Sequence, residues 1–307
     1  MKRPLLPTVA VTVLLAALVS ACGDDEPSGA DDPVSPASGS PSESEPGDTG
    51  TTDAATDEPT ESGGGSAGTV TVPVYFVGDT PQGPRLFREF RKVEADNPLE
   101  EAAALMTAGD TLDPDYRTMY PGGSFDSVSF ENGEFVVAVQ DDGWNTAGAG
   151  SEGQLAVQQL VYTLQGVEQT RAPVRIVFAG SGEPAEVFFG QDASGGFRQA
   201  PPTDVLGLVN VTTPEEGSTV ADTFSATGVA SSFEATVPWE VRDRSGEVVA
   251  DGFATAEGWG EKLYPWETEV DVSGLEPGTY EFVALTDDPS NGEGGGPHED
   301  SKTITVE

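Results

Sequence analysis

The chain has 307 residues, of which 53 are Asp or Glu and only 14 are Lys or Arg, so its formal net charge is −39. Nucleic acids and anionic lipid headgroups are recognised first through Lys and Arg, so this charge excludes nucleic acid as a partner. A single Cys and a single His exclude a disulfide framework and a Cys/His metal site. The length leaves room for two domains of about 100 to 130 residues each.

The first 22 residues have the layout of an export signal. A basic start precedes an apolar run over residues 5–19, and residues 18–21, Leu-Val-Ser-Ala, stand immediately before Cys22. This ending resembles a bacterial lipobox, in which the Cys thiol is diacylated and the signal is removed, so that the Cys becomes the new N-terminus. We therefore expect a lipoprotein signal peptide over residues 1–21 and a lipid anchor, with palmitate as one acyl chain, on Cys22.

The alternatives are an uncleaved transmembrane helix and ordinary cleavage that leaves a free thiol. A spanning helix needs about 20 apolar residues, more than this run provides, and Pro7 and Thr12 interrupt it. An unpaired Cys is a liability in an exported protein. Two acyl chains hold a protein on a membrane without a spanning segment, so we expect lipid anchoring on the extracytoplasmic face of the cell membrane.

Residues 22–68 have the composition of a tether. Residues 23–68 contain 12 acidic residues and no basic ones, among Ser, Thr, Gly, Pro and Ala. Such a stretch cannot bury enough apolar surface to offset its chain entropy, so we expect it to be disordered and to hold the folded part away from the membrane. Recruitment of a basic partner by this acidic run is the alternative.

Ordered structure is expected from Thr69. Residues 69–77 and 85–93 are rich in β-branched and aromatic residues and predict two strands. The second carries four cations, to which we assign local charge balance: Arg85, Arg88, Arg91 and Lys92. A helix is predicted from an N-cap at Asn97, with Pro98 and Glu100 in a reciprocal capping arrangement, to Gly109.

The remaining elements of this region follow the same logic. Alternating residues on both sides of Asn132-Gly133 predict a type I′ hairpin. A second helix is predicted from a capping box at 151–154 to just before Gly166, followed by strands over 173–178 and 185–189. The order β-β-α-β-β-α-β predicts an α+β sandwich over residues 69–190, with helices on one face of a sheet.

Several segments of this region together resemble the sporulation and spore-germination domain called GerMN: Val74–Phe76, Ala103–Gly109, Tyr120–Gly123, Glu131–Gly133 and Gln159–Leu164. That family is similar in fold to the ring-building modules of secretion and sporulation channels. The resemblance implies a ring-building-motif-like α+β domain.

After a Gly- and Pro-rich stretch over 191–204, which we interpret as a linker, short strands with regular turns predict an all-β sandwich over residues 205–307. Seven strands in about 100 residues are typical of an immunoglobulin-like domain. The segment ending in Gly278-Thr279-Tyr280 indicates a tyrosine corner. Residues 211–217, 235–241 and 258–259 resemble the immunoglobulin-like domain of bacterial spore-germination proteins, which often follows a GerMN domain in envelope lipoproteins.

Catalytic chemistry has little support. The only base available to a Ser nucleophile is His298, and the adjacent acids Asp141 and Asp142 have the pattern of a solvated turn. The loop at 287–300 has Asp, Asn and Gly at calcium-loop positions, but Pro289 and His298 occupy positions where ligands are needed. We therefore predict a non-enzymatic protein without cofactor or metal, and leave cation binding by this loop open.

Aromatic residues concentrate in the second domain. Trp239 shares a strand face with Val237 and is predicted to be core, whereas Trp259, Tyr264 and Trp266 flank turns and are predicted to form an exposed ligand or partner surface. The leading hypothesis is a membrane-anchored envelope protein that binds or scaffolds a protein partner near the cell wall, in signalling or wall remodelling. The alternative is a module that binds peptidoglycan or another glycan.

Replacement of Cys22 with Ser tests the anchor. We expect the Ser variant to lose acylation and the cleavage that depends on it, because the hydroxyl cannot replace the thiol as acyl acceptor. Metabolic labelling with palmitate and fractionation of membranes measure both effects. A Ser variant that is still processed and still labelled would contradict the prediction.

Overall fold

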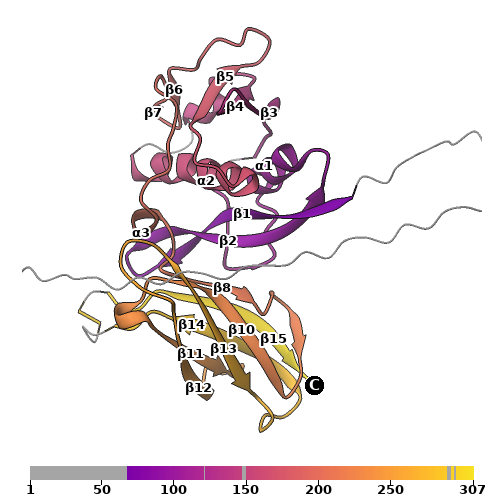
Figure 1. The fold of residues 1–307 in the computed structure, drawn as a ribbon, viewed down its shortest axis with the longest axis vertical. Helices are drawn as coiled ribbons and strands as arrows, with labels where there is room; N and C mark the ends of the chain where they lie inside the picture. The colour runs from indigo at the N-terminus through magenta and orange to yellow at the C-terminus, as the bar shows by residue number, and fades with distance from the viewer. Residues whose placement is uncertain (1–67, 121, 147–149, 289–291, 294) are drawn as a thin grey trace, which may run out of the picture. The chain divides into compact units, whose positions relative to one another are not determined.

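The computed structural model describes residues 68–120, 122–146, 150–288, 292–293 and 295–307. The expected signal peptide, the lipidation site Cys22 and nearly all of the expected tether lie outside these residues. Residues 63–307 form one compact unit, in which the described chain builds two domains in sequence order (Figure 1). No helix in the described part of the chain is both long and apolar enough to cross a membrane.

The first domain begins with a long hairpin. Strands β1 (Thr69–Thr80) and β2 (Gly83–Glu94) pair antiparallel without a break in register. Both contain many β-branched and aromatic residues, which fit a pleated, half-buried surface, and Gly83 takes a positive φ of 109° at the turn. These are the first two strands that the sequence predicts, each extended toward the turn.

A second hairpin and a parallel neighbour form the other sheet of this domain. Strands β3 (Ser127–Glu131) and β4 (Glu134–Val139) turn at Asn132-Gly133, whose φ values of 53° and 81° fit the predicted type I′ turn. Strand β5 (Val174–Phe178) pairs parallel with β4 after a crossover through helix α2 (Ser151–Glu168). The predicted α+β class is confirmed.

The layering of this domain differs from the prediction. Helices α1 (Pro98–Ala108) and α2 lie between the β1-β2 hairpin and the β3-β4-β5 sheet, not on one face of a single sheet (Figure 1). The outer edge of β1 is already occupied: Tyr75 N–H donates to Thr163 Oγ1, and Val77 exchanges two backbone hydrogen bonds with Arg117. The hairpin therefore cannot join the second sheet, and both pack around one core.

Helix α2 is buried on nearly every side, and its polar residues bond to neighbouring backbone. Gln159 is fully buried; its amide donates to the Tyr75 carbonyl at 2.9 Å and accepts from Met119 N–H at 3.0 Å. Gly166 lies against Pro73, since a Cβ at Gly166 would come within 2.7 Å of the proline ring. This glycine is a packing position, so the helix continues through it to Glu168, beyond the predicted end.

The predicted side-chain caps are absent. Helix α1 starts after Asn97 and ends at the left-handed Gly109, as predicted, but Asn97 donates its side-chain amide to Glu100 and caps no backbone N–H. Helix α2 has Gly150 as its N-cap, so Ser151 is already helical and the capping box predicted there is wrong. Both helix starts are held by packing of their apolar faces.

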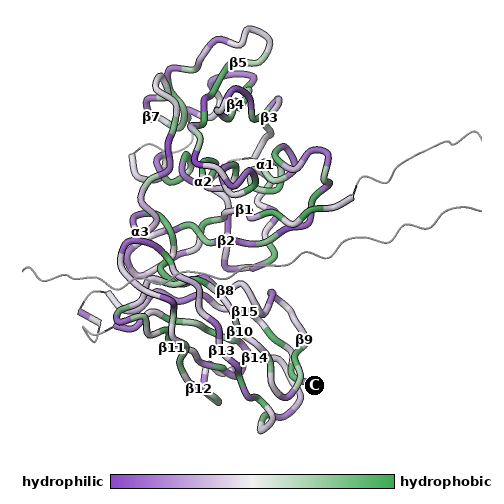
Figure 2. The backbone as a smooth tube through the Cα atoms, viewed as in Figure 1, coloured by the Kyte–Doolittle hydropathy of each residue, from purple (hydrophilic) through white to green (hydrophobic). Residues whose placement is uncertain are grey.

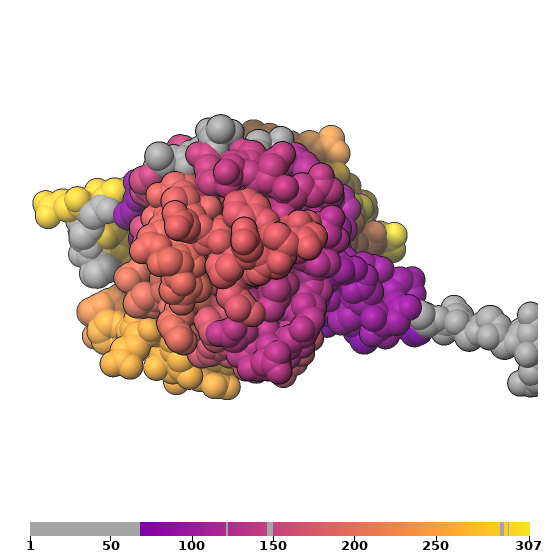
Figure 3. Space-filling model, turned by 90° about the horizontal axis from the view of Figure 1, so that it is seen from above, coloured from indigo at the N-terminus to yellow at the C-terminus, as the bar shows by residue number. Residues whose placement is uncertain are grey.

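The stretch interpreted as a linker belongs to the first domain. Strands β6 (Val187–Phe188) and β7 (Gln191–Asp192) form a small hairpin. Phe197 is buried in the core and exchanges backbone hydrogen bonds with Val174. The short helix α3 (Pro202–Val205) then leads into the second domain. Composition suggested an inter-domain linker, but two buried apolar residues, Ala193 and Phe197, fix this stretch to the core. Figure 3 looks onto this domain, whose residues cover most of the face in view.

The second domain is the predicted all-β sandwich. One sheet has the order β13-β10-β8 and the other β12-β11-β14-β15-β9, and they share one core. The strands are β8 (Val209–Thr213), β9 (Ser218–Val220), β10 (Thr223–Ala230), β11 (Thr236–Arg242), β12 (Val248–Thr255), β13 (Tyr264–Asp271), β14 (Gly278–Leu285) and β15 (Glu299–Val306). Strand β9, which the sequence did not predict, pairs parallel with β15.

Local signals in this domain are confirmed. Buried and half-buried residues alternate along β11, with Val237, Trp239 and Val241 facing inward. Figure 2 shows that hydrophobic and hydrophilic residues both occur along the strands of this domain. The Tyr280 hydroxyl donates to the Glu276 carbonyl at 2.8 Å, which completes the predicted tyrosine corner.

Replacement of Gln159 with Leu tests the bonds between α2 and β1. The leucine has a similar size but leaves the Tyr75 carbonyl and the Met119 N–H without their partners, so we expect a loss of about 2 to 4 kcal/mol in the free energy of unfolding. Urea denaturation followed by circular dichroism measures it. The control is Gln154→Leu on the exposed face of the same helix, where a change within about 0.5 kcal/mol is expected. Equal effects would refute the argument.

Candidate functional site at the interface of the two domains

The two domains meet through an aromatic stack and a glycine. Phe87 of β2 and Tyr116, in the loop after α1, stack with ring centroids 5.2 Å apart. Gly207 lies against Phe87, since a Cβ there would come within 2.4 Å of the ring. The N–H of Gly207 donates to the Leu86 carbonyl at 2.9 Å. The domains can approach this closely only because residue 207 is a glycine and has no side chain.

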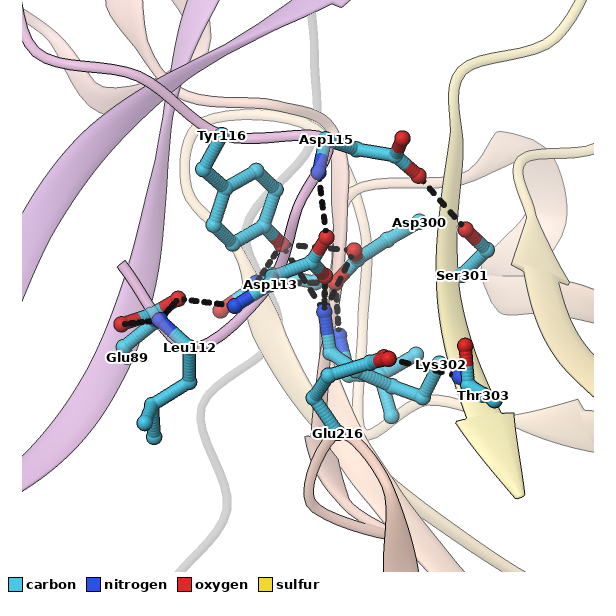
Figure 4. Close-up of polar contacts among 12 residues, drawn as sticks. Glu89, Leu112, Asp113, Asp115, Tyr116, Glu216, Asp300, Ser301, Lys302 and Thr303 are labelled. Carbon is cyan, nitrogen blue, oxygen red and sulfur yellow. Dashed lines mark hydrogen bonds and ion pairs between the residues drawn. The ribbon is translucent and has the colours of Figure 1, made fainter. Parts of the chain in front are cut away.

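A buried ionic cluster crosses this interface (Figure 4). The Lys302 ammonium pairs with Asp113 and, at 3.0 Å, with Asp300. The Tyr116 hydroxyl donates to Asp300 Oδ1 at 2.6 Å and accepts from Lys302 Nζ at 3.1 Å. Asp113 and Tyr116 belong to the first domain, whereas Asp300 and Lys302 lie on β15. Only 7%, 3% and 1% of the Lys302, Asp113 and Asp300 side chains is exposed, so the charges are shielded from water.

Both carboxylate oxygens of Asp300 have partners. Its Oδ2 accepts from the Asn210 side-chain amide at 2.9 Å and from the Val211 N–H at 2.6 Å. Asp300 therefore ties β15 to β8 within the second domain, while its other oxygen bonds to Tyr116 of the first domain.

Glu89 holds the loop that presents Asp113. Its Oε1 accepts from Leu112 N–H at 3.0 Å and from Asp113 N–H at 2.9 Å, and the residue is 7% exposed (Figure 4). Arg91 lies 3.5 Å from the other oxygen and also pairs with Asp110. The loop is thus anchored to β2 before it reaches the second domain.

Burial and charge shift the titration of this cluster. Burial raises the pKa of Asp113 to about 6, although Lys302 opposes the shift. Burial works to lower the pKa of Lys302, but Asp300 and Asp113 together raise it above its usual value. Burial and the two carboxylates raise the pKa of Tyr116 well above 10.0, so its hydroxyl remains a donor. The lysine stays charged across the physiological range.

His298 is another buried titratable group near the interface. Its Nδ1 accepts from Leu208 N–H at 3.2 Å, and the residue is 3% exposed. Burial and the charge of Arg85 lower the pKa of His298 to about 4. The imidazole is therefore neutral at pH 7 and serves as a hydrogen-bond acceptor.

The basic residues of β2 divide into two groups. Arg91 balances local acids, as expected. Arg85 instead donates to the Thr203 carbonyl at 2.9 Å, and Arg88 donates to Thr212 Oγ1 at 3.3 Å. For these two the assignment to local charge balance is wrong, because their partners are neutral groups at the junction with the second domain.

The predicted aromatic surface is only partly formed. Trp259 is 53% exposed, and Tyr264 is half-buried. Trp266 is only 3% exposed and lies in the core, so the prediction that it is exposed is wrong. The reason is Gly228 on the paired strand β10: a Cβ there would come within 2.6 Å of the Trp266 ring, so the missing side chain makes room for the indole. Trp239 is buried, as predicted.

Exposed Phe233 of the 3-10 helix η2 (Phe233–Ala235) is the actual neighbour of Trp259. The two rings meet edge to face, with centroids 5.3 Å apart and an interplanar angle of 68°. The Ser231 hydroxyl bonds to the backbone of Gly260 and so joins the two loops that carry the pair. No local pattern in the sequence predicts this pair, because the two residues are far apart in the chain.

The other sites considered from the sequence show no assembled chemistry. Asp141 accepts from Gly143 N–H at the start of the 3-10 helix η1 (Asp142–Thr146), which is a turn interaction. In the loop at 287–300, residues 289–291 and 294 lie outside the described residues. Within the described ranges no group of three or more His, Cys, Asp or Glu side chains is placed to hold a metal ion.

The ionic cluster was not predicted, although β15 carries a signal for it. Asp300 and Lys302 share the inward face of β15 with Ile304 and Val306. Two charged residues on the same strand face as core residues indicate a buried pair or a partner surface. The partners Asp113 and Tyr116 have no such pattern, because they lie in an irregular loop.

Replacement of Lys302 with Met tests the cluster. The change leaves two buried carboxylates without their counter-charge, so we expect the free energy of unfolding to fall by about 3 to 5 kcal/mol. Chemical denaturation followed by tryptophan fluorescence measures it. Lys92→Met, at an exposed position of β2, is the control and should change stability by less than about 0.5 kcal/mol. Similar losses in both variants would contradict a special role for Lys302.

His298 and Asp113 should give the stability opposite pH dependences. The pKa of His298 is lowered from 6.5 to about 4, so only the unfolded chain takes up a proton as the pH falls through this window, and stability is lost. The pKa of Asp113 is raised from 3.8 to about 6, so the folded chain takes up its proton first and stability is gained.

The stability loss between pH 7 and pH 4.5 should therefore shrink by roughly 2 kcal/mol in His298→Asn, which keeps an acceptor for Leu208 N–H. It should grow by a similar amount in Asp113→Asn. Denaturant titrations at both pH values measure the differences, and equal losses in the parent and both variants would contradict the assignment.

Comparison with known proteins identifies both domains. Residues 73–183 match the family model described as sporulation and spore germination. Residues 208–293 match the model described as the immunoglobulin-like domain of bacterial spore germination. A comparison with curated proteins gives no match.

Two solved structures are similar to part of this chain. The tandem GerMN domains of the sporulation protein GerM from Bacillus subtilis are 12% identical, with a TM-score of 0.35; the match covers 67% of this chain and 62% of that one, less than two thirds of its length. CopC from Methylosinus trichosporium is 17% identical over 32% of this chain and 93% of that one, with a TM-score of 0.22.

The family matches agree with the two resemblances seen in the sequence and with the fold of each domain. The chain carries a sporulation and spore germination domain followed by an immunoglobulin-like domain of bacterial spore germination.

Proposed function

We propose that this protein is a non-enzymatic envelope lipoprotein, anchored through Cys22 on the extracytoplasmic face of the cell membrane, that binds or scaffolds a protein partner near the cell wall. The observation that carries this proposal is the exposed aromatic pair Phe233 and Trp259, of which 40% and 53% of the surface is accessible. Exposed aromatic groups mark interaction sites more often than they serve stability.

The pair is held ready for binding. Its two loops are joined through Ser231 and Gly260, so little conformational freedom remains to be lost when a partner docks. Further apolar side chains are exposed on the same domain, along β12: Val248, Val249 and Phe253. Strand β12 is also an edge of its sheet, where backbone groups are open to pairing with another chain.

The ionic cluster supports a scaffolding role. Because Asp113, Asp300 and Lys302 join the two domains through buried charges, the domains present their surfaces in a fixed relation. A tether at residues 22–68 would allow this body to reach a partner away from the membrane. Signalling and wall remodelling are the processes in which such a protein would act.

A glycan-binding module remains the second candidate. Sugar rings stack on flat, open aromatic faces, and Trp259 offers one. The three-residue platform expected from the sequence is not assembled, since Trp266 is buried and the Lys262 ammonium lies 4.8 Å from the centroid of the Tyr264 ring. The edge-to-face geometry of Phe233 and Trp259 also provides no common plane. These features favour a protein partner.

Photo-crosslinking in intact cells tests the proposal. A photoreactive residue at Phe233 should capture one protein, and that protein, once purified, should bind the parent chain. We expect Trp259→Ala to weaken this binding by about 30-fold or more without changing the melting temperature, because a central aromatic contributes about 2 kcal/mol or more. Phe130→Ala, an exposed aromatic of the first domain that is 38% accessible, should leave binding unchanged.

Binding to purified wall material separates the two candidates. If the parent binds it and Trp259→Ala does not, the glycan module is correct. If Trp259→Ala and Phe130→Ala reduce binding of the captured protein equally, the aromatic pair is not its site.

A further inference from the structure

A cavity of about 210 Å³ at the junction of the two domains has an unusual charge. Its lining includes Arg88 from β2, Arg171 from the segment between α2 and β5, and Lys262 from the loop before β13, but no Asp or Glu. An adjoining cavity of about 160 Å³ shares Tyr75, Tyr162 and Arg171 and also contains no acid. Three cations from three separate segments thus meet at one opening.

This composition stands out because the chain is so acidic. Asp and Glu outnumber Lys and Arg by 53 to 14. Two other cavities at the junction contain acids: one, which Arg88 also lines, includes Glu216, and the other includes Glu299. Among the described residues, the ion pairs with carboxylates do not include Arg88, Arg171 or Lys262. Their charges are not balanced by a carboxylate in direct contact.

In the part of the chain that the structure describes, Arg88 and Arg171 donate to neutral groups, and the Lys262 ammonium lies over the Tyr264 ring. Arg88 donates to Thr212 at 3.3 Å, and Arg171 donates to the Gln199 side chain. The Arg88 Nε is shielded from solvent and has no hydrogen-bond partner among the described residues. A buried donor without a partner is costly to the fold.

The charges of Arg88 and Arg171 both affect the Tyr75 hydroxyl, so the two guanidinium groups lie near each other. Burial raises the pKa of the Tyr75 hydroxyl, and both guanidinium groups oppose that shift. The Tyr75 ring lies 5.3 Å from that of Tyr162, so two phenols stand beside the two arginines. Guanidinium groups in such a place bind carboxylates and phosphates through paired hydrogen bonds.

The other lining residues indicate what the rest of the ligand must be. Leu86, Leu206 and Leu263 supply apolar walls from both domains. A ligand that fits this lining has an anionic head and a short apolar body.

We infer that this cavity binds a small anionic ligand whose carboxylate or phosphate head is held by Arg88, Arg171 and Lys262, with its apolar part against the leucines. The site goes beyond the proposed partner binding and does not depend on it. Because both domains contribute to the lining, the ligand would bind only when they are docked, and it would therefore stabilise the docked arrangement.

Calorimetric titration of the full-length protein tests this inference, with inorganic phosphate, acetate and hexanoate as probes at constant ionic strength in chloride. We expect saturable binding of at least one probe. Arg171→Gln and Lys262→Gln should each weaken it by about 10-fold, since each removes one charge-assisted hydrogen bond. Arg244→Gln is the matched control, because it removes the same charge at a different cavity, beside Thr279, and it should leave the affinity unchanged.

Comparison among the probes identifies the head and the body. Tighter binding of hexanoate than of acetate would show that the apolar part of the ligand lies against the leucines. Tighter binding of phosphate than of acetate would show that the anionic head is a phosphate. The inference is overturned if no probe binds saturably. It is also overturned if Arg244→Gln weakens binding as much as the two cavity variants, because the effect would then be general electrostatics.

Discussion

The described part of this protein depends on the buried contact of Lys302 with Asp113 and Asp300. Burying three charges costs much of their hydration, and the contact is stable only because each charge has several partners. Tyr116 and the Val211 N–H complete the set. Once made, the cluster is demanding in geometry, since removal of Lys302 would leave two buried carboxylates without their counter-charge. It therefore gives the junction one defined arrangement.

The cluster also explains why the first domain has its particular shape near the junction. Asp113 lies in an irregular loop that would be mobile without support, and Glu89 supports it by accepting two consecutive backbone N–H groups. Glu89 is held in turn by its place in the long β1-β2 hairpin. The same hairpin contributes Phe87 to the aromatic stack and Arg88 to the cationic cavity. One strand thus serves core, junction and candidate ligand site together.

Charge is distributed unevenly around the cavities of this acidic chain. One cavity at the junction is lined by acids such as Asp79, Asp115 and Glu299, whereas another is lined by three cations and no acid. Exposed aromatic residues lie elsewhere, on the loops of the second domain. The described residues therefore include exposed aromatic side chains, on which the proposed partner binding rests, and a cationic cavity, on which the inferred anion site rests.

The sequence by itself determined most strands of both domains and the two long helices, because strand alternation, the Asn132-Gly133 turn and the tyrosine corner are local patterns. Its motifs also carried the resemblance to the two families that match. It could not determine that α1 and α2 lie between two sheets, since that depends on Thr163 and Arg117 occupying the edge of β1. Nor could it tell buried Trp266 from exposed Trp259, because the difference lies in Gly228 on a strand far away in the chain. Two partners of Lys302, Asp113 and Tyr116, are likewise 189 and 186 residues distant. Only the tertiary structure brings such residues together, and interactions between distant residues leave no periodic signal in a sequence.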